Sequence, residues 1–281
     1  MLAYQLNQQE GYSKSSLARV LNFSRSLFYH RSRLEIKDRR LAWKIEQIHA
    51  GEDNTLGHRS LSRLLKTGKN RVRRIMKKYG IQARRPSRKY RYTGKSNLVH
   101  ANLANNPILQ SVVSVIIFSD IFELRLADGS RVRGSFALRK DTRQILSLVF
   151  DYGMGQELIR SVIRHLDSQK LLAIFHSDQG KQYGAELTIN ELLKKGFSAS
   201  MSRAGTPTDN PFAERFVGLF KHAVVGRHPY HSLGEFLEAA KNWINFYNNR
   251  RPHQGIGNIS PNEYAKRHGI KTISHLANLS V

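Results

Sequence analysis

The chain has 281 residues, 40% of them apolar, which is enough for an ordinary buried core together with smaller modules. It has no cysteine, so disulfide bonds and thiolate zinc sites are excluded. No apolar run of about 18 residues and no basic-then-apolar amino-terminal signal points to a membrane. The net charge of +25 favours a soluble protein with a polyanionic partner, and nucleic acid is a better candidate than an anionic membrane.

Residues 1–36 are predicted to form a weak helix-turn-helix. Two short helices are expected within residues 14–33, and Leu17 and Ala18 lie on the apolar face of the first. Ser24, at the end of the turn between them, suits the N-cap of the second helix. A plain helical hairpin is the alternative.

Residues 37–81 are predicted to form a second and more basic helical module. A helix at about 38–50 is followed by two more, near 58–66 and 69–79, which make a second helix-turn-helix candidate. The last helix carries six basic residues and no acid, which favours phosphate contact over a merely solvated face. The residues expected to bind nucleic acid here are Arg71, Arg73, Arg74 and Lys77.

Residues 82–104 are predicted to be a basic linker. This stretch begins with almost no aliphatic side chains, and Tyr90 and Tyr92 could stack on bases. The residues expected to follow a nucleic-acid backbone are Arg84, Arg85, Arg88 and Lys89.

From about residue 105 the pattern becomes that of an α/β core with a mixed central sheet. The run Val112–Phe118 is almost continuously apolar, as expected of a strand that is buried on both faces. Further strands are expected at about 131–138, 144–150, 171–175 and 197–201, and helices at about 155–168, 184–195, 209–225 and 232–249.

Three acidic residues of this core suggest a site. Asp120 and Asp178 each follow an apolar strand, where polar groups leave a sheet and ligands bind. Glu214 falls in the first turn of a helix that begins near Asn210, with Pro211 tolerated at its start. Converging carboxylates need a counter-cation, and two divalent metals are a known device for displacement at a phosphodiester. The hypothesis is a metal-dependent polynucleotidyl transferase, although each acid taken alone is more often a surface or first-turn residue.

Two sequence blocks around these acids match a known family. His176–Tyr183 matches the pattern HSDxGxxY, and Ser200–Glu214 matches SMSRxGxPxDNxxAE. Together with the stretch up to Lys221, these blocks closely resemble the catalytic core of retroviral-integrase-like transposases. The greatest similarity is to the second-frame transposase protein of the insertion-sequence-three family. A weaker match stands at Leu56–Arg59, and a tail pattern is matched by Tyr247, Asn248, Arg251, His253, Ile256, Ser260, Pro261 and Tyr264.

The resemblance implies an RNase H-like core over residues 105–268, followed by a tail at 269–281. Asp120, Asp178 and Glu214 would be the catalytic residues and would hold two Mg²⁺ or Mn²⁺ ions. The implied activity is DNA nicking and strand transfer at the terminal inverted repeats of an insertion sequence, in the bacterial cytoplasm on nucleoid DNA. A homo-oligomer on DNA is implied, and a first-frame protein is a candidate partner. The remaining residues expected to contact DNA are Arg203, Lys221, Arg250, Arg251 and His253.

The surroundings of Asp120 depart from the family pattern. The family has Trp-x-Thr-Asp-Ile-Thr there, whereas this chain has Ile117–Phe122, without the tryptophan or the threonines. Glu123 and Asp141 are therefore alternative acids. His176 is expected to shape the strand end rather than to bind metal. Two other functions stay open: a DNA-binding regulator or accessory subunit without chemistry, and an RNase H-type nuclease.

Overall fold

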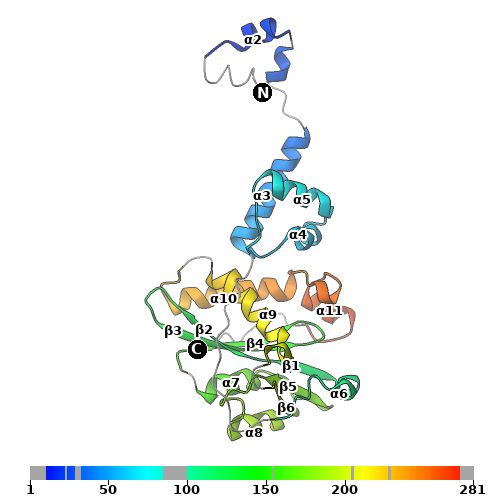
Figure 1. Ribbon diagram of the computed structural model, residues 1–281, viewed down its shortest axis with the longest axis vertical. Coiled ribbons are helices and arrows are strands. Elements are labelled where there is room, and N and C mark those ends of the chain that lie inside the picture. Colours follow the sequence, from blue (N-terminus) through cyan, green and yellow to red (C-terminus); the bar gives the residue numbers. More distant parts are fainter. Residues whose placement is uncertain are drawn as a thin grey trace. The chain divides into compact units, whose positions relative to one another are not determined.

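The computed structural model describes residues 11–22, 24–28, 33–84, 100–153, 155–203, 206–226 and 229–272. The chain divides into two compact units, Met1–Glu46 and Gln47–Val281, whose elements are labelled in Figure 1. Three of the predicted backbone contacts, Arg85, Arg88 and Lys89, lie outside the described residues.

The first unit contains the predicted amino-terminal helices only in part. Helix α2 (Lys14–Val20) is capped by the Ser13 hydroxyl, which accepts a hydrogen bond from the Ser16 amide at 3.1 Å. The predicted second helix is a single 3₁₀ turn, η1 (Arg25–Phe28), and residues 29–32 lie outside the described part of the chain. Helix α3 (Arg33–Gly51) then runs on into the second unit.

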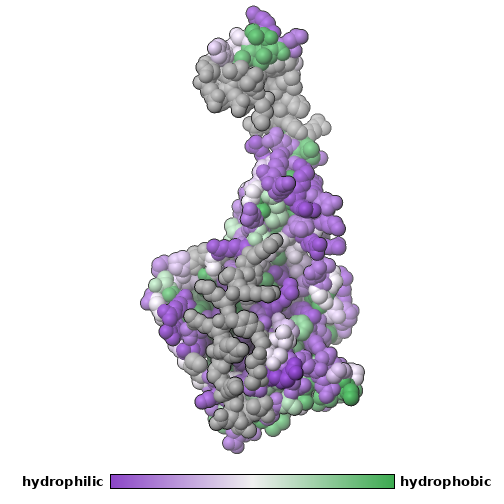
Figure 2. Space-filling view, viewed as in Figure 1, coloured by the Kyte–Doolittle hydropathy of each residue, from purple (hydrophilic) through white to green (hydrophobic). Residues whose placement is uncertain are grey.

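The predicted basic helices are present at the start of the second unit. Helix α4 (His58–Leu64) is followed by α5 (Lys69–Lys78), whose Val72 and Ile75 are buried. The charged residues of α5 are exposed, and Figure 2 shows the hydrophilic surface around α4 and α5. The exposed candidates for DNA contact on this helix are Arg71, Arg73, Arg74 and Lys77.

A single mixed sheet forms the centre of the second unit. Strand β3 pairs antiparallel with β4 on one side and with β1 and β2, end to end, on the other; β1 pairs parallel with β5, and β5 with β6. Three antiparallel strands followed by two parallel ones are the arrangement of an RNase H-like sheet, so the predicted fold is confirmed. The strands are β1 (Val115–Phe118), β2 (Ile121–Arg125), β3 (Arg131–Arg139), β4 (Ile145–Asp151), β5 (Ala173–Ser177) and β6 (Phe197–Met201).

Helices cover both faces of the sheet (Figure 1). On one face α7 (Gln156–Arg164) and α8 (Glu186–Lys194) pack over a largely aliphatic core that includes Ile117. The other face is aromatic, because α9 (Pro211–Phe220) and α10 (Leu233–Asn249) bring rings against the strands. Phe216 of α9, for example, lies 4.4 Å from Phe136 of β3, centroid to centroid.

Two further elements connect these layers. Helix α9 continues into the π-helical segment η3 (Lys221–Val225), and α11 (Pro261–Arg267) follows α10 after a 3₁₀ turn, η4 (Gln254–Ile256). In the described part of the chain, no helix has both the length and the apolar character needed to cross a membrane.

Three predicted strand boundaries are corrected by local effects. The strand expected over Val112–Phe118 begins only at Val115, because the Asn106 side chain caps helix α6 (Pro107–Val112). Strand β2 was not predicted, since only alternate residues of it are buried. Strand β5 begins at Ala173, because Leu171 is 71% exposed.

Gly134 of β3 provides a test of the aromatic face. A Cβ atom at this position would lie 2.6 Å from Phe122 Cζ and 2.7 Å from Phe150 Cε1, so Gly134→Ala forces two packed rings apart. We expect the free energy of unfolding to fall by about 1–3 kcal/mol, measured by urea denaturation.

Gly218→Ala is the matched control. A Cβ on Gly218 meets nothing within 4 Å, and the residue lies in helix α9, so this change should leave stability equal or raise it by about 0.5–1 kcal/mol. Equal stability of the two variants would contradict the packing described for Gly134.

Candidate active site

Asp120 and Asp178 leave the sheet at the same edge and at the same level. Phe118 of β1 is the register partner of His176 of β5 in the parallel pair, and each acid follows its partner residue by two positions. Backbone amides fix both carboxylates: Asp120 Oδ1 accepts from Ile121 N at 2.8 Å, and Asp178 Oδ1 accepts from Gly180 N at 3.1 Å. The strand register therefore brings these two predicted acids together.

Electrostatics join the remaining predicted residues to this pair. Asp120 is partly exposed as a residue, but its carboxyl group is enclosed. Burial, then the charge of Asp178 and, more weakly, that of Glu214 raise the pKa of this group, which reaches about 8. Lys221 of η3 acts in the opposite direction and lowers the pKa. Asp178, Glu214 and Lys221, which is one of the residues predicted to contact DNA, thus all act on the Asp120 carboxyl group.

These acids suit a hard divalent cation by their chemistry. Carboxylate oxygens are the ligands that Mg²⁺ prefers, and a cation would offset both the burial and the repulsion by Asp178 that hold the pKa of Asp120 high. Among the described residues, no three His, Asp or Glu side chains are already gathered closely enough to hold an ion. Glu214 is exposed on α9 and acts more weakly on Asp120 than Asp178 does.

Ser119, which sequence reasoning did not single out, ties the three motif regions together. Its amide donates to His176 O at 2.9 Å, and its hydroxyl lies 2.9 Å from the Tyr183 hydroxyl. Its carbonyl accepts from Asn210 Nδ2 at 3.0 Å, so the residue at the start of α9 holds the chain beside Asp120. Asn210 makes no side-chain cap bond to α9.

The unusual sequence around Asp120 is accommodated by this packing. Ile117, where the family pattern has tryptophan, is fully buried in the aliphatic core, and Ser119 retains a hydroxyl in place of threonine. Phe122 belongs to the aromatic face, 5.5 Å from Phe220. Both alternative acids are paired elsewhere: Glu123 with Arg133 at 3.3 Å, and Asp141 with Arg139 at 2.7 Å.

His176 shapes the strand end and keeps a neutral ring. Its Nδ1 lies 2.8 Å from Ser200 Oγ and its Nε2 lies 3.1 Å from Ser202 Oγ. Ser200 Oγ already accepts the Leu103 amide at 2.9 Å, so its own hydrogen is available to Nδ1, and the ring proton is then on Nε2. Burial lowers the pKa of His176 to about 4. With hydroxyls at both ring nitrogens, His176 is not placed as a metal ligand.

The loop before α9 is held by a buried carboxylate. Asp209 accepts two hydrogen bonds from the Arg203 guanidinium, at 3.0 and 3.1 Å, and one from the Asn105 amide at 3.1 Å. The Arg203 side chain lowers the pKa of Asp209 to about 2. Arg203 is 72% exposed and holds the loop through Asp209; its contact with DNA stays a prediction.

Arg251 was expected to bind DNA, and its placement does not fit that role. It is buried, and its Nε donates to Asp53 Oδ2 at 2.7 Å. Asp53 is itself fully buried and also accepts from the Thr55 amide at 2.8 Å. The guanidinium therefore ties the segment after α3 to the segment after α10. The sequence alone gave no signal for this role.

Three other residues that were predicted to contact DNA have partners within the protein. Arg250 forms an ion pair with Glu52, and Arg84 donates to Gly226 O. His253 packs edge-on against Tyr247, 4.5 Å between ring centroids, and burial lowers its pKa well below the usual value. His253 therefore has a structural role in packing against Tyr247.

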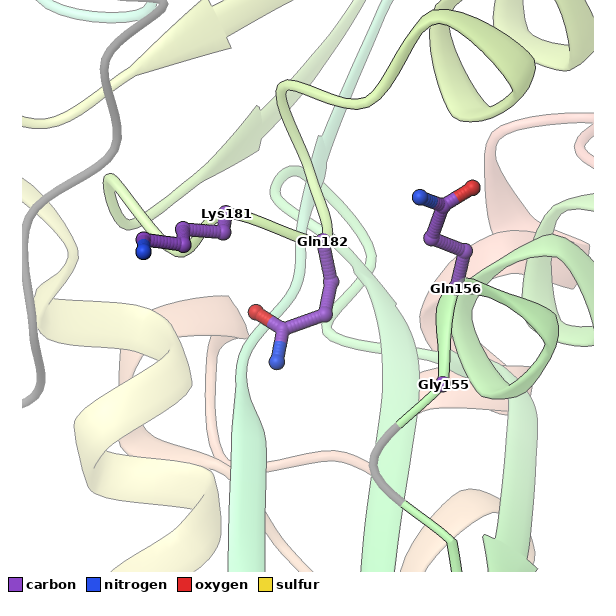
Figure 3. A pocket seen from close by; sticks show the side chains of 4 residues that line it. All are labelled: Gly155, Gln156, Lys181 and Gln182. Atoms are coloured by element: carbon purple, nitrogen blue, oxygen red, sulfur yellow. The ribbon is translucent and has the colours of Figure 1, made fainter.

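A shallow hollow of about 370 Å³ adjoins the Asp178 loop. Gln156, at the start of α7, and Gln182, in the loop after β5, face it from opposite sides, while Lys181 extends away (Figure 3). The lining contains no acid, so the hollow is distinct from the carboxylate cluster.

The chain is similar to known proteins over most of its length. The family model described as an integrase core domain matches residues 195–261, which include Glu214 but neither Asp120 nor Asp178. The chain is 29% identical to the uncharacterized 31 kDa protein of insertion element IS600 from Shigella sonnei, over 90% of this chain and 98% of that protein. It is 24% identical to the transposase for insertion sequence element IS904 from Lactococcus lactis, over 71% of this chain and 81% of that protein.

A solved structure also resembles the chain. The catalytic core domain of BIV integrase matches with a TM-score of 0.41 and 15% identity, over 54% of this chain and 95% of that one.

The neutral His176 predicts a loss of stability in acid. The folded state keeps the ring unprotonated down to about pH 4, whereas the unfolded chain binds a proton below about pH 6.5. The stabilisation is therefore complete above about pH 6.5 and is lost as the pH falls towards 4. It amounts to at most about 3 kcal/mol, at ~1.4 kcal/mol per pKa unit.

His176→Gln keeps a side chain that can hydrogen-bond to both serines but does not titrate. The free energy of unfolding of this variant should therefore lack the pH-dependent part that His176 contributes. Urea denaturation at several pH values between about 7 and 4 measures it. Parallel pH profiles for the wild type and the variant would contradict a buried neutral imidazole.

The Arg251–Asp53 pair predicts strong coupling between two distant segments. Asp53→Asn and Arg251→Met each leave the buried charge of the other residue unpaired. Each change should lower the free energy of unfolding by about 3–5 kcal/mol, and the double variant should recover much of this loss. Arg267→Met, which breaks the exposed Arg267–Glu263 pair, is the control and should cost under about 1 kcal/mol. Additive effects of the two buried changes in a denaturation cycle would disprove the coupling.

Proposed function

We infer that this chain is a DNA transposase with an integrase-like core, of the insertion-sequence-three type. We propose that Asp120, Asp178 and Glu214 are its catalytic residues and hold two divalent metal ions, Mg²⁺ or Mn²⁺. The reaction would be DNA nicking and strand transfer at the ends of an insertion sequence.

The observation that carries the proposal is the electrostatic convergence on Asp120. Two strands, β1 and β5, deliver Asp120 and Asp178 to one edge, and α9 brings Glu214 within range from another layer of the fold. A buried carboxyl group next to two other acids is unfavourable unless it takes a proton or a cation. Such a cluster is costly for a purely structural element and is expected at a site that binds metal.

The proposed metals would activate a water molecule or a 3′-hydroxyl for in-line attack and stabilise the leaving oxygen. The protein's own part is positioning. Asn210 and Ser119 fix the start of α9 to the end of β1, so Glu214 and Asp120 keep a defined relation. Lys221, one residue beyond α9, places a positive charge where the anionic DNA backbone approaches.

The basic surface supports DNA as the substrate. Exposed α5 carries Arg71, Arg73, Arg74 and Lys77 with no acid on the same helix. We propose that this helix contacts DNA phosphates and that the substrate is element-end DNA, which places the protein on the bacterial nucleoid. Assembly as a homo-oligomer on DNA and association with a first-frame protein belong to the same proposal.

A DNA-binding regulator without chemistry is the weaker alternative. It was motivated by the departures around Asp120, yet Ile117 and Phe122 fill the two cores, and Asp120 still faces the other acids. The sequence change therefore alters the packing behind the acid without removing the acid from the cluster.

Replacing the acids tests the proposal. Purified protein is given element-end DNA with Mg²⁺, and strand transfer is measured for Asp120→Asn, Asp178→Asn and Glu214→Gln. Each change should lower the rate at least about 100-fold, because several kcal/mol of charge stabilisation are lost and ~1.4 kcal/mol corresponds to a factor of ten.

Glu123→Gln is the matched control. Glu123 lies three residues beyond Asp120 but pairs with Arg133 on β3, so its loss should leave the rate within about a factor of three. Wild-type activity in both Asp178→Asn and Glu214→Gln would end the proposal, and loss of activity in Glu123→Gln alone would move the first acid to that residue.

A further inference from the structure

Two arginines near Phe212 of α9 make no ion pair with any described residue. Arg143 lies in the turn between β3 and β4, and Arg215 follows Glu214 on α9. Neither takes part in a salt bridge within the described part of the chain, although elsewhere in it arginines such as Arg139, Arg160 and Arg203 pair with acids. The site therefore contains positive charge that the protein itself does not neutralise.

The Arg143 side chain is held in a defined position. Its Cζ lies 4.1 Å from the centre of the Phe212 ring, and its Nη1 donates to Lys140 O. On its other side, the backbone at Gly255 is so close that a Cβ there would lie 3.5 Å from Arg143 Nη2. A guanidinium that is fixed in this way loses little conformational freedom when it binds a ligand.

The backbone of Arg143 is also unusual. Its φ of 64° lies in the left-handed region, which a branched or long side chain seldom adopts. Strain of this kind costs of order 1 kcal/mol or more and is concentrated at functional sites. The turn could place a glycine or an asparagine here at lower cost, so the presence of an arginine suggests a use for its side chain.

Arg215 shares its surroundings with Arg143. Phe212, on which Arg143 lies, precedes Arg215 by three residues on α9, so the two positions are neighbours on the helix surface. Both guanidinium charges act on the Tyr247 hydroxyl and on the His253 ring, and they act on each other. Arg251 acts there too, but Asp53 neutralises it.

Little negative charge opposes this pair. Asp141 is the carboxylate that acts on Arg143, and it is already held by Arg139 through two hydrogen bonds, at 2.7 and 3.0 Å. Burial is the largest cause that lowers the pKa of Arg143, and the charge of Arg215 lowers it weakly. The Nε2 atom of His253 is buried with no hydrogen-bond partner among the described residues.

We propose that Arg143 and Arg215 bind a phosphodiester group of the DNA. The inference rests on the proposed function for its choice of ligand. A guanidinium group carries several N–H donors in one plane and suits the oxygens of a phosphate, and Glu214 precedes Arg215 on α9. A phosphate held here fixes the strand relative to the acids, so both arginines are positioning residues.

The test measures DNA binding without chemistry. Full-length protein is titrated against a fluorescent duplex of arbitrary sequence at several salt concentrations, in the absence of divalent ions. Arg143→Gln/Arg215→Gln should reduce the slope of log affinity against log salt by about 0.9, the value for one phosphate contact. Arg160→Gln/Arg164→Gln removes the same charge from α7, where both arginines pair with acids, and should leave the slope unchanged.

A second variant guards against misfolding. Arg143 packs on Phe212, so its loss could disturb the turn; Arg215→Gln alone changes an exposed helical position and should lower the affinity about tenfold at low salt. Equal slopes in the two double variants, with an unchanged affinity for Arg215→Gln, would overturn the phosphate site. That result would leave the strand-transfer tests of Asp178 and Glu214 unaffected, whereas activity that survives those changes refutes the proposed function itself.

Discussion

The repulsion between buried carboxylates at one edge of the sheet is the constraint on which the rest of this structure depends. The parallel register of β1 and β5 forces Asp120 and Asp178 together, and burial makes their like charges costly. The surrounding contacts keep that arrangement from relaxing. Ser119 is bonded on three sides, the neutral His176 ring spans two serines, and the lysine after α9 offsets part of the charge.

Much of the fold could be predicted because its strands and helices carry strong periodic patterns. The continuous apolar runs of β1 and β5 predicted a doubly covered sheet, and β6 begins and ends as expected, at Phe197 and Met201. The pattern failed where a local hydrogen bond overrode it, as at Asn106, and where burial alternates, as in β2. Periodicity alone does not record which polar side chain caps the next helix.

Motif spacing singled out the three acids of the proposed site, whereas it gave no sign of the residues that contact them. Ser119 carries no chemistry, and its role depends on contacts with Tyr183 and Asn210, which are 64 and 91 residues away in the chain. For Arg251, by contrast, the sequence suggested a role that its position in the fold does not support. A basic residue in a basic protein suggests a phosphate, but only the fold shows that Asp53, 198 residues away, lies against it. Long-range pairing of this kind leaves no periodic trace in one sequence.

The Arg251–Asp53 contact also limits how such chains can be recombined. A hybrid that took its amino-terminal helices from one relative and its sheet from another would inherit the two halves of this pair from different parents. If either parent lacked its member of the pair, the hybrid would bury the Arg251 or the Asp53 charge without an ion-pair partner. Such a hybrid would fold poorly even if both parent proteins fold well. The segment that contains Asp53 and the segment that contains Arg251 must therefore come from the same parent, although 198 residues separate them in the chain.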